Sequence, residues 1–576
     1  MIAAVNNAAG LVTAAAADTV QKIDAPTVDL RAVLPVLIVL GGACLGVLVE
    51  AVFQRRTRYP VQLFVTLATL VAAAVAVVWG AVDRHYAVTF AGSIAVDQAS
   101  YVSWGVILVL AVLSVLLIAD RVSEPGGAIV AQAAVRVGSK QEAAAARRVL
   151  PMHTEVFPLT LFAIGGMLVF PAASDLLTLF VALEVLSLPL YLMSGMARRR
   201  RLISQEAAVK YFLLGAFASA IMLYGIALLY GYAGGIGFSD IRRVAQLGTG
   251  SDVLLLAGIA LLFVGLLFKA SVGPFHLWTP DVYQGAPTPV TAFMAACTKA
   301  AAFAAMMRIL IVALEPMTWT WRPVLWWVAI ASMAIGAIMG ITQTDFKRML
   351  AYSSIAHAGF LLLGVMAVSD KGASATLFYL LTYGVATIGA FAILTIVRRA
   401  SPGADPDGPG GVGPEAGSVA DWAGLAKRSP LLAASMSLFL LSFAGIPLTS
   451  GFIGKLSVFS AAAAEGMGAL VVVAMVATAI TAFFYLRIVV LMYFSDPPSG
   501  TVTLPSGAAG GDGSGAAGES AAGVLTATRT QARTVVIAPG ALTAAVITVC
   551  VILTLALGIV PSWGLDLTEI TSGFLY

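Results

Sequence analysis

The chain is built from long apolar stretches separated by short polar segments. Fourteen stretches can be counted, and most approach the about 20 residues that a helix needs to cross the hydrocarbon core of a bilayer. The pattern therefore predicts an all-α polytopic membrane protein with about 14 transmembrane helices. The approximate limits of the stretches are 32–53, 61–81, 101–119, 156–172, 176–196, 205–232, 253–284, 288–313, 324–342, 349–369, 373–397, 431–464, 468–494 and 540–562.

Two stretches, 253–284 and 431–464, are longer than one straight span. Each contains a Gly/Pro interruption, at Ser271–Pro274 in the first and at Ala444–Pro447 in the second. Non-helical backbone at bilayer depth is tolerated only where protein or a water-filled cavity satisfies its polar groups. We therefore expect helices 7 and 12 to be discontinuous, with both breaks facing the protein interior.

A weak internal repeat relates the two broken stretches. The segment Ala207–Leu214 (AAVKYFLL) aligns with Ser374–Leu381 (SATLFYLL), and a broken stretch follows each copy. This alignment predicts two related units of five helices, at 156–313 and 324–494. Since five is odd, consecutive units enter the membrane from opposite sides, which is the inverted-repeat design of many transporters.

The rest of the chain divides around these two units. We expect an extramembrane lead at 1–31, three helices and a loop at 32–155, and a last helix within 540–576. Two segments rich in Gly, Ala, Pro and Ser, a linker at 400–420 and a loop at 495–539, have the composition of flexible connections. The glycine-rich part of the second has no GK[ST] motif, so it does not predict a phosphate-binding loop.

Composition agrees with a membrane protein and gives its orientation. Hydrophobic residues make up 60% of the chain and charged residues 11%, far from the averages for soluble domains. Most of the 33 basic residues fall in loops that follow odd-numbered stretches, with the clearest cluster at Arg198–Arg201. Positive loops face the cytoplasm, so both termini are expected outside.

Redox chemistry is not expected in this chain. The three cysteines, Cys44, Cys297 and Cys550, lie singly in apolar stretches, and the chain has only four histidines. No spacing fits an iron–sulfur cluster, and a zinc site is not indicated. Electron carriers would have to be bound by partner chains.

Ionisable residues inside the predicted helices are the best candidates for function, because they are costly in a membrane. Glu184 and Lys299 lie far from the ends of their stretches. Lys269 precedes the break of helix 7, and Lys455 follows the break of helix 12 by eight residues. The alternatives are a hydrogen-bonded core glutamate and, for the lysines, side chains that reach the interface. The length of stretch 253–284 favours a deep position for Lys269.

Other ionisable residues carry a weaker signal. Lys210 follows Glu206 by four residues, so a structural i,i+4 pair competes with a functional role. His357 fits a relay or a hydrogen-bonded core histidine equally well, and His276 fits a role at the break or as a cap. Arg308 and Arg487 are nearer the ends of their stretches, where snorkelling to the interface is expected.

A buried Glu/Lys series can move protons. Burial disfavours the charged form of a lysine, whereas a nearby carboxylate favours it. Bringing Glu184 toward Lys210 or Lys269 would hold a proton on the lysine, and separating them would release it toward Lys299 or Lys455. Moving one charge against 100 mV costs about 2.3 kcal/mol, and nothing in this chain supplies that energy.

Several motifs resemble one family. These motifs are KASVGPFHLWTPDVYQGAPTPV from Lys269, LEVLSLPLY around Glu184, TKAAAF around Lys299, AYSSIAHAG around His357 and GIPLTSGFIGK ending at Lys455. Together they are similar to the antiporter-like membrane subunits of bacterial respiratory complex I, the proton-pumping NADH:quinone oxidoreductase. The resemblance covers about 156–495 and is strongest to subunit N.

The resemblance implies a fold, a function and site residues. It implies 14 helices with inverted repeats, proton translocation coupled to electron transfer from NADH to quinone in partner subunits, and a place in the bacterial inner (plasma) membrane. No cofactor is implied in this chain, whereas flavin and iron–sulfur clusters belong to partners. The implied partners are other complex I membrane subunits, quinone through the complex, and lipid. The implied site residues are Glu184, Lys210, Lys269, Lys299, Lys455 and His357.

Two other functions remain open at this point. Subunits L and M and the Mrp-type cation/proton antiporters share the fold, but their helix 7 motif tends to read WLPDAMxGPTPVSAL, whereas this chain has WTPDVYQGAPTPVTA. Lys455 is unlike the glutamate of subunit M, and no long helix follows the last stretch, as it does in subunit L. A passive scaffold would not need the intramembrane Glu/Lys series.

Overall fold

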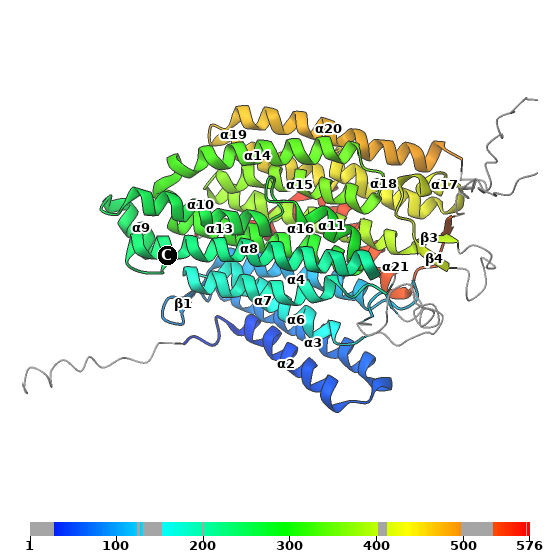
Figure 1. Cartoon of the computed structure of the whole chain (residues 1–576), viewed down its shortest axis with the longest axis horizontal. Coiled ribbons are helices and arrows are strands. Elements are labelled where there is room, and N and C mark those ends of the chain that lie inside the picture. Colours follow the sequence, from blue (N-terminus) through cyan, green and yellow to red (C-terminus); the bar gives the residue numbers. More distant parts are fainter. Residues whose placement is uncertain are drawn as a thin grey trace, which may run out of the picture.

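Fourteen membrane crossings can be traced in the described part of the chain. The structure, a computed structural model, describes residues 28–123, 127–130, 153–198, 201–400, 412–496, 534–571 and 573–575. Within these residues, 12 helical segments are long and apolar enough to cross a membrane. A shorter apolar helix, α6, adds one crossing, and the two halves of a broken helix, α18 and α19, add another (Figure 1). The predicted polytopic all-α fold is confirmed.

The helices follow the predicted stretches with small differences at their ends. The α-helices are α2 (Leu34–Val52), α3 (Arg55–Val82), α4 (Gln98–Ile118), α6 (Val156–Ala172), α7 (Leu176–Ser194), α8 (Arg201–Ala233), α9 (Phe238–Leu247), α10 (Asp252–Lys269), α11 (Trp278–Gly285), α12 (Thr288–Phe293), α13 (Lys299–Arg308), α14 (Thr318–Ile341), α15 (Phe346–Met366), α16 (Asp370–Ile396), α17 (Leu425–Arg428), α18 (Pro430–Ala444), α19 (Ser450–Ala464), α20 (Gly468–Phe494), α21 (Ala541–Ile559) and α22 (Pro561–Thr568). Short 3-10 turns occur at η3 (Glu315–Met317) and η4 (Val419–Trp422).

Two small sheets mark opposite ends of the bundle. Strands β1 (Ala87–Thr89) and β2 (Ile94–Val96) pair antiparallel at the end of the bundle where α9 lies. We call this the β1 end. Strands β4 (Val412–Glu415), β3 (Val397–Ala400) and β5 (Thr534–Val536) form the second sheet in that order, at the β3 end (Figure 1). Of the predicted linker 400–420, the described part thus includes a strand. The glycine-rich segment 499–523 and most of the lead 1–31 lie outside the described residues.

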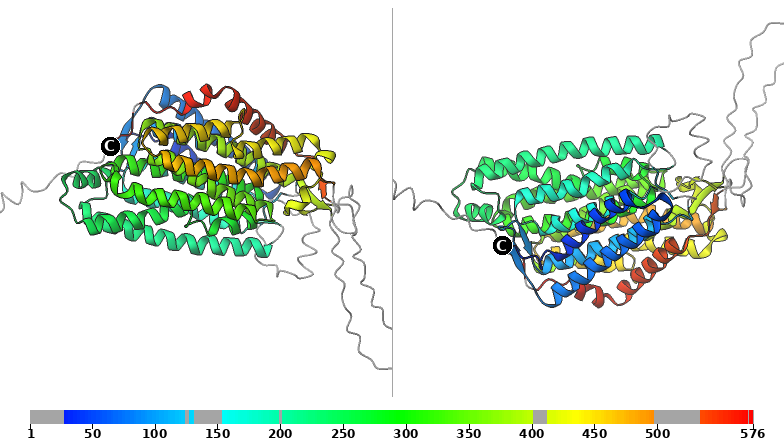
Figure 2. Two further views of the ribbon diagram at one scale, coloured as in Figure 1. Left: turned by 90° about the horizontal axis from the view of Figure 1, so that it is seen from above. Right: turned by 90° about the horizontal axis from the view of Figure 1, so that it is seen from below.

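The first and last described segments lie at the same end of the bundle. The backbone N–H of Asp29 donates to Thr89 in β1 at 2.8 Å, and that of Leu575 donates to Asp97 beside β2 at 3.0 Å. The two further views show α2, α3, α21 and α22 along one side of the bundle (Figure 2). An even number of crossings requires this common end.

The loops at the ends of α7 and α15 show that the two five-helix units are inverted copies. Asp175 caps α7 and Asp345 caps α15 through side-chain bonds to the first-turn N–H groups. Beside the first cap, the Leu176 N–H donates to the Ile236 carbonyl, and the Phe238 N–H donates to the Ser174 carbonyl. Beside the second cap, the Phe346 N–H donates to the Gly417 carbonyl, and the Val419 N–H donates to the Thr344 carbonyl. The first pairing lies at the β1 end and the second at the β3 end, so equivalent helices run in opposite directions.

Helix packing repeats in the same way. Helix α6 packs on α7 and on α13, just as α14 packs on α15 and on α20. Helices α8 and α11 pack together, and so do α16 and α19. Helix α15 is buried along its whole length, and α12, α13 and α16 nearly so. The interior of the bundle therefore lies where the two units meet.

Two charged residues hold the ends of a segment outside the described residues. Lys427 pairs with Asp496, just beyond α20, at 2.6 Å. Its neighbour Arg428 donates to the carbonyl of Thr534, the first residue of β5, at 2.7 Å. The chain thus leaves and re-enters the β3 end at adjacent points.

Candidate functional site

The two broken helices place their interruptions where they were predicted. Helix α10 ends at Lys269, and α11 begins at Trp278. Helix α18 ends at Ala444, and α19 begins at Ser450. Left-handed backbone at Ser271 and Gly445 turns the chain out of the helix at each break. The lysines beside the breaks, Lys269 and Lys455, are each 3% exposed and lie in the interior. The expectation that the whole of each break faces the interior is wrong, because Leu277 in the first break and Ile446–Leu448 in the second are exposed.

Lys269 has neutral hydrogen-bond partners on two helices. Its ammonium group donates to the Ser187 hydroxyl of α7 at 2.8 Å and to the Tyr211 hydroxyl of α8 at 3.3 Å. Ser187 lies one turn beyond Glu184, which accepts a hydrogen bond from Ser219 of α8. In this conformation Lys269 is near Glu184, but its hydrogen bonds go to hydroxyl groups. A small shift of α7 would change the distance between the Lys269 ammonium group and the Glu184 carboxylate.

Glu184 lies at the surface of the chain rather than in its interior. The residue is half-buried, and its neighbours Val181 and Leu188 on α7 are 57% and 52% exposed. A carboxylate facing hydrocarbon without a partner is costly. Within the described residues, the Ser219 hydroxyl and the nearby charge of Lys269 act on this carboxylate, while the α7 surface around it is apolar and exposed.

Lys299 lies between the two repeats. Its ammonium group donates to both the carbonyl and the hydroxyl of Ser354 on α15, each at 2.6 Å, and lies 5.4 Å from the centre of the Tyr383 ring of α16. Lys299 follows a π-helical segment, η1 (Met294–Thr298), and a second, η2 (Ile309–Ala313), follows Arg308. Such interruptions are frequent at functional sites.

His357 continues the row on the same face of α15 as Ser354. One ring nitrogen bonds to the Tyr379 hydroxyl at 2.6 Å and the other to the Tyr485 hydroxyl at 3.3 Å. The imidazole lies 4.8 Å from the Tyr383 ring, between Lys299 and the second break. A histidine with a tyrosine on each nitrogen can pass a proton by exchanging tautomers.

Lys455 ends the row at the second break. Its ammonium group donates to the carbonyls of Phe443 and Ala444, at 2.7 and 3.3 Å. These are last-turn carbonyls of α18, which have no helical partner and carry the negative end of the helix dipole. The break thus supplies the acceptors that this buried cation needs.

Aromatic rings join the first lysine to the second. Tyr211, which bonds to Lys269, stacks on Trp278 with ring centres 4.5 Å apart, and Trp278 contacts Tyr283 at 6.2 Å. Tyr283 in turn interacts with Ser354, the partner of Lys299. Buried polar and aromatic side chains therefore extend from Lys269 through Lys299 and His357 to Lys455, and Glu184 lies one turn from the Lys269 partner Ser187.

Lys210 lies apart from this row. It pairs with Glu206, as the spacing predicted, and also with Asp281 of α11, at 2.6 and 2.7 Å. Asp281 also binds Arg348 of α15 at 2.5 Å. The Lys210 side chain is 42% exposed. Lys210 therefore belongs to a partly exposed ion-pair cluster toward the β3 end, and this cluster joins the two repeats.

The structure also shows polar residues that the sequence did not single out. The hydroxyl partners Ser187, Tyr211, Ser354, Tyr379 and Tyr485 are ordinary residues of apolar stretches, and only their spatial positions mark them. The expectation that Arg308 snorkels to the interface is wrong, because its side chain is 1% exposed and paired with Asp97 at 2.6 Å. Arg487 is exposed and reaches the Ile341 carbonyl near a helix end, as expected.

A cluster at the β3 end lies outside the membrane-spanning segments. Glu415 of β4 accepts bonds from Lys347 and Thr288, both at 2.6 Å, and these three residues line a small open pocket of about 40 Å³. Burial by itself would raise the pKa of Glu415, but the charges of Lys347 and Arg398 and these hydrogen bonds lower it to about 2. The carboxylate is therefore charged at any physiological pH.

The lowered pKa of Glu415 has a consequence for stability. A carboxylate whose pKa falls on folding stabilises the protein above its unfolded value and loses that contribution as pH falls toward the folded value. We expect Glu415→Gln to lower the free energy of unfolding by about 3 kcal/mol near pH 7, with the difference shrinking below about pH 4. Thermal unfolding of the detergent-purified protein between pH 3 and 7 measures it, with the exposed Glu465→Gln as control. An unchanged difference at pH 3 would contradict this account.

The described part of the chain shows no candidate metal site. No group of three or more His, Cys, Asp or Glu residues there could hold a metal ion. The fold and the row of buried lysines define an antiporter-like, ion-translocating membrane subunit, with two inverted repeats and a break in each. This class includes both redox-driven and gradient-driven systems.

Comparison with known proteins identifies the family. Residues 173–481 match the family described as NADH:quinone oxidoreductase/Mrp antiporter, TM. A relative from Saccharopolyspora erythraea, named NADH-quinone oxidoreductase subunit N, is 52% identical over 549 residues, which cover 95% of this chain and 98% of the relative. One of the same name from Rhodococcus opacus is 49% identical over 567 residues, which cover 95% of this chain and 96% of the relative. The chain belongs to this family of antiporter-like membrane subunits.

Solved structures agree on the fold. A chain in the structure of respiratory complex I from Thermus thermophilus with bound aureothin is 31% identical, with a TM-score of 0.68 and coverage of 92% of this chain and 98% of that one. A chain of the Mrp complex from Dietzia sp. is 24% identical, with a TM-score of 0.71 and coverage of 94% and 96%. The complex I chain and the Mrp chain thus share the fold of this protein. The complex I chain is the more similar in sequence, at 31% identity against 24%.

Proposed function

We propose that this chain is the N-type, proton-translocating membrane subunit of an NADH:quinone oxidoreductase. Relatives that match nearly the full chain at about half identity carry that name. The single structural observation that carries the proposal is the row of buried ionisable side chains, Lys269, Lys299, His357 and Lys455, which crosses both repeats and begins beside Glu184. NADH and quinone would react in partner subunits, and this chain would use that energy to move protons.

The proposed mechanism uses the row as a set of proton positions. Glu184 approaching Lys269 stabilises the ammonium form, and its withdrawal leaves Lys269 with only the hydroxyls of Ser187 and Tyr211. The proton then favours positions further along, at Lys299, His357 and Lys455. Neutral acceptors surround each of these groups, so a modest change in nearby charge decides where the proton stays. We assign Lys210 to the ion-pair cluster that aligns α8 with α11.

The exposed face around Glu184 indicates where a partner binds. Glu184 lies on α7 beside exposed apolar residues, where lipid would add no polar partner to the Ser219 hydroxyl. We infer that another membrane subunit of the complex covers this face and supplies polar or charged groups. Such a subunit could transmit the effect of quinone reduction to Glu184. Lipid would cover the apolar surfaces of α14 and α20.

For orientation, we propose that the β3 end faces the cytoplasm and that both termini lie outside, in the plasma membrane of a bacterium. The loops at the β3 end carry Arg55, Arg198, Lys347 and Lys427, as the positive-inside rule requires. A membrane-impermeant maleimide should label Glu465→Cys on intact cells but Thr342→Cys only after permeabilisation. The opposite labelling pattern would reverse the orientation.

The driving force tests the function directly. The intact complex, purified with its flavin and iron–sulfur subunits and reconstituted in vesicles, should take up protons when NADH and quinone are added, with or without sodium. An uncoupler should abolish the pH gradient while NADH oxidation continues. Purification of this chain without redox partners, together with proton exchange driven by a sodium gradient, would instead establish the Mrp-type alternative.

A further inference from the structure

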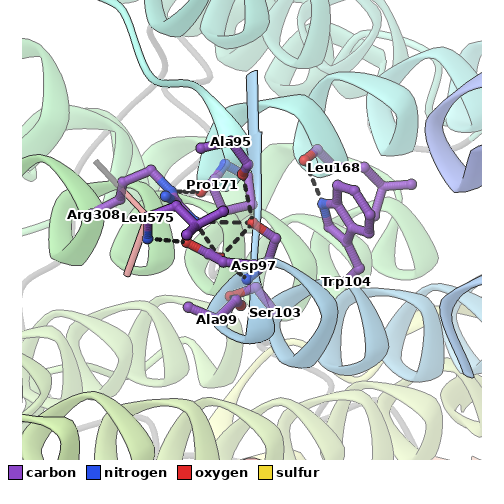
Figure 3. A network of polar contacts seen from close by, with 10 residues as sticks. Ala95, Asp97, Ala99, Ser103, Trp104, Leu168, Pro171, Arg308 and Leu575 are labelled. Atoms are coloured by element: carbon purple, nitrogen blue, oxygen red, sulfur yellow. Dashed lines mark hydrogen bonds and ion pairs between the residues drawn. The ribbon is translucent and has the colours of Figure 1, made fainter. Parts of the chain in front are cut away.

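A buried ion pair lies near the β1 end of the bundle, apart from the row of lysines. Arg308 of α13 pairs with Asp97, which caps α4, and the two side chains are 1% and 2% exposed. Arg308 Nη2 donates to Asp97 Oδ1 at 2.6 Å and to Ser100 Oγ at 2.9 Å, and its Nε donates to the Pro171 carbonyl at 2.5 Å. Figure 3 shows Arg308 reaching both Asp97 and Pro171, with Leu575 also bonded to Asp97.

The pair joins parts of the chain that are far apart in sequence. Asp97 belongs to the N-terminal helices, Pro171 and Arg308 to the first repeat, and residues 573–575 to the segment after α22. That segment contacts both charges, because Leu575 N–H donates to Asp97 Oδ2 at 3.0 Å and the Phe574 ring lies 5.3 Å from the Arg308 guanidinium. Residues 573–575 therefore form a strap over the pair at the β1 end.

The position of Arg308 relates it to the row. It lies nine residues after Lys299 on the same helix, about 13 Å along the axis at 1.5 Å per residue. The side chains between them, including Phe303, Met306 and Met307, are apolar and buried. Helix segment 299–308 thus separates the central lysine from the β1 end by a packed apolar layer, with one π-helical segment on each side of it.

The stability of the fold does not explain this pair. Replacing a buried ion pair by apolar side chains is often neutral or stabilising, because desolvation offsets the attraction. A buried pair does, however, fix the relative position of the elements that carry it. A π-helical segment lies on each side of α13, and the pair fixes the end of α13 nearer the β1 sheet relative to α4 and α6.

We propose that Asp97 and Arg308 are positioning residues that seal the β1 end of the proton path. By holding segment 299–308 against α4 and α6, the pair keeps the apolar layer closed between Lys299 and the β1 surface. The strap 573–575 holds Asp97 in place. This inference rests on the proposed function, since it assigns the seal to the same proton path.

The test separates leakage from pumping. The reconstituted complex carries Asp97→Asn, Arg308→Lys or Leu575→Pro, the last of which removes the N–H that bonds to Asp97. Leu575→Ala keeps that N–H and is the matched control. Passive proton entry is measured under an imposed potassium diffusion potential without NADH, and protons per NADH are measured separately, with flavin content giving the amount of assembled complex.

A seal makes distinct predictions for each variant. Asp97→Asn and Leu575→Pro should raise passive proton entry several-fold and lower protons per NADH, whereas uncoupled NADH oxidation stays unchanged. Arg308→Lys should be intermediate, because an ammonium group can reach Asp97 but cannot also hold the Pro171 carbonyl. Leu575→Ala should match the wild type.

Failure of the proposed seal and failure of the proposed function would give different results in these measurements. Wild-type leakage and wild-type protons per NADH in both Asp97→Asn and Leu575→Pro complexes would overturn the seal. If Asp97→Asn does not assemble, Leu575→Pro decides the question alone. A wild-type complex that oxidises NADH without proton uptake would overturn the proposed function instead, whatever the variants do.

Discussion

Lys269→Ala is expected to reduce NADH-driven proton uptake and quinone reductase turnover together, by at least about tenfold, a factor that corresponds to 1.4 kcal/mol. Lys269 is the group on which the Glu184 charge acts. Alanine removes the ammonium group that donates hydrogen bonds to the Ser187 and Tyr211 hydroxyls. Without a proton to move there, the electrostatic step and the redox step that drives it both stall. Glu184→Ala should cause a similar joint loss.

The measurement compares turnover with proton uptake in the same vesicles. Lys371→Ala is the control, since this lysine is exposed at the start of α16 and belongs to no part of the row. Normal proton uptake per NADH in both Lys269→Ala and Glu184→Ala complexes would remove the basis for the relay. A loss of uptake with full turnover would show that the two steps are not obligatorily coupled at this site.

The second large effect is expected at Lys299, and the structure predicts a graded series. Lys299→Met removes the only cation between the two breaks in the described row and should abolish proton transfer from one repeat to the other. Ser354→Ala should be milder, because the Ser354 carbonyl still accepts a bond from Lys299 at 2.6 Å after the hydroxyl is lost. Both variants keep the apolar packing of α13 against α15.

Proton uptake per NADH in reconstituted complexes ranks the series. Wild type, Ser354→Ala and Lys299→Met should follow in descending order, and the exposed Ser460→Ala provides a control, because its hydroxyl bonds to the Ser457 carbonyl of its own helix. A Ser354→Ala complex as inactive as Lys299→Met would mean that the hydroxyl itself carries the proton. A fully active Lys299→Met complex would place the route elsewhere.

Much of the architecture was accessible from the sequence because the bilayer restricts what a chain can do. Length and apolar composition predict spans, and a Gly/Pro break in an overlong stretch predicts a discontinuous helix. The intramembrane positions of Glu184, Lys269, Lys299 and Lys455 followed from the same rule. These features are local, and each can be read from about 30 residues.

Features that depend on contacts between distant segments could not be read in this way. Lys299 meets Ser354 only because α13 and α15 pack with a particular rotation, and no pattern along either helix specifies that rotation. Arg308 and Asp97 each look like residues near a helix end, so snorkelling was the natural expectation for the arginine. Their pairing across 211 residues makes both of them interior. The π-helical segments lie in stretches of small and apolar residues that carry no signal for them.

The adjacent anchors at Lys427 and Arg428 bear on how this chain can vary among related organisms. Because Asp496 and Thr534 are held by consecutive residues, the distance between the two points does not depend on how many residues connect them. The entropic cost of closing such a loop rises only with the logarithm of its length. Insertions and deletions there should accumulate with little effect on the membrane bundle, which makes this segment a suitable place for a fused reporter domain.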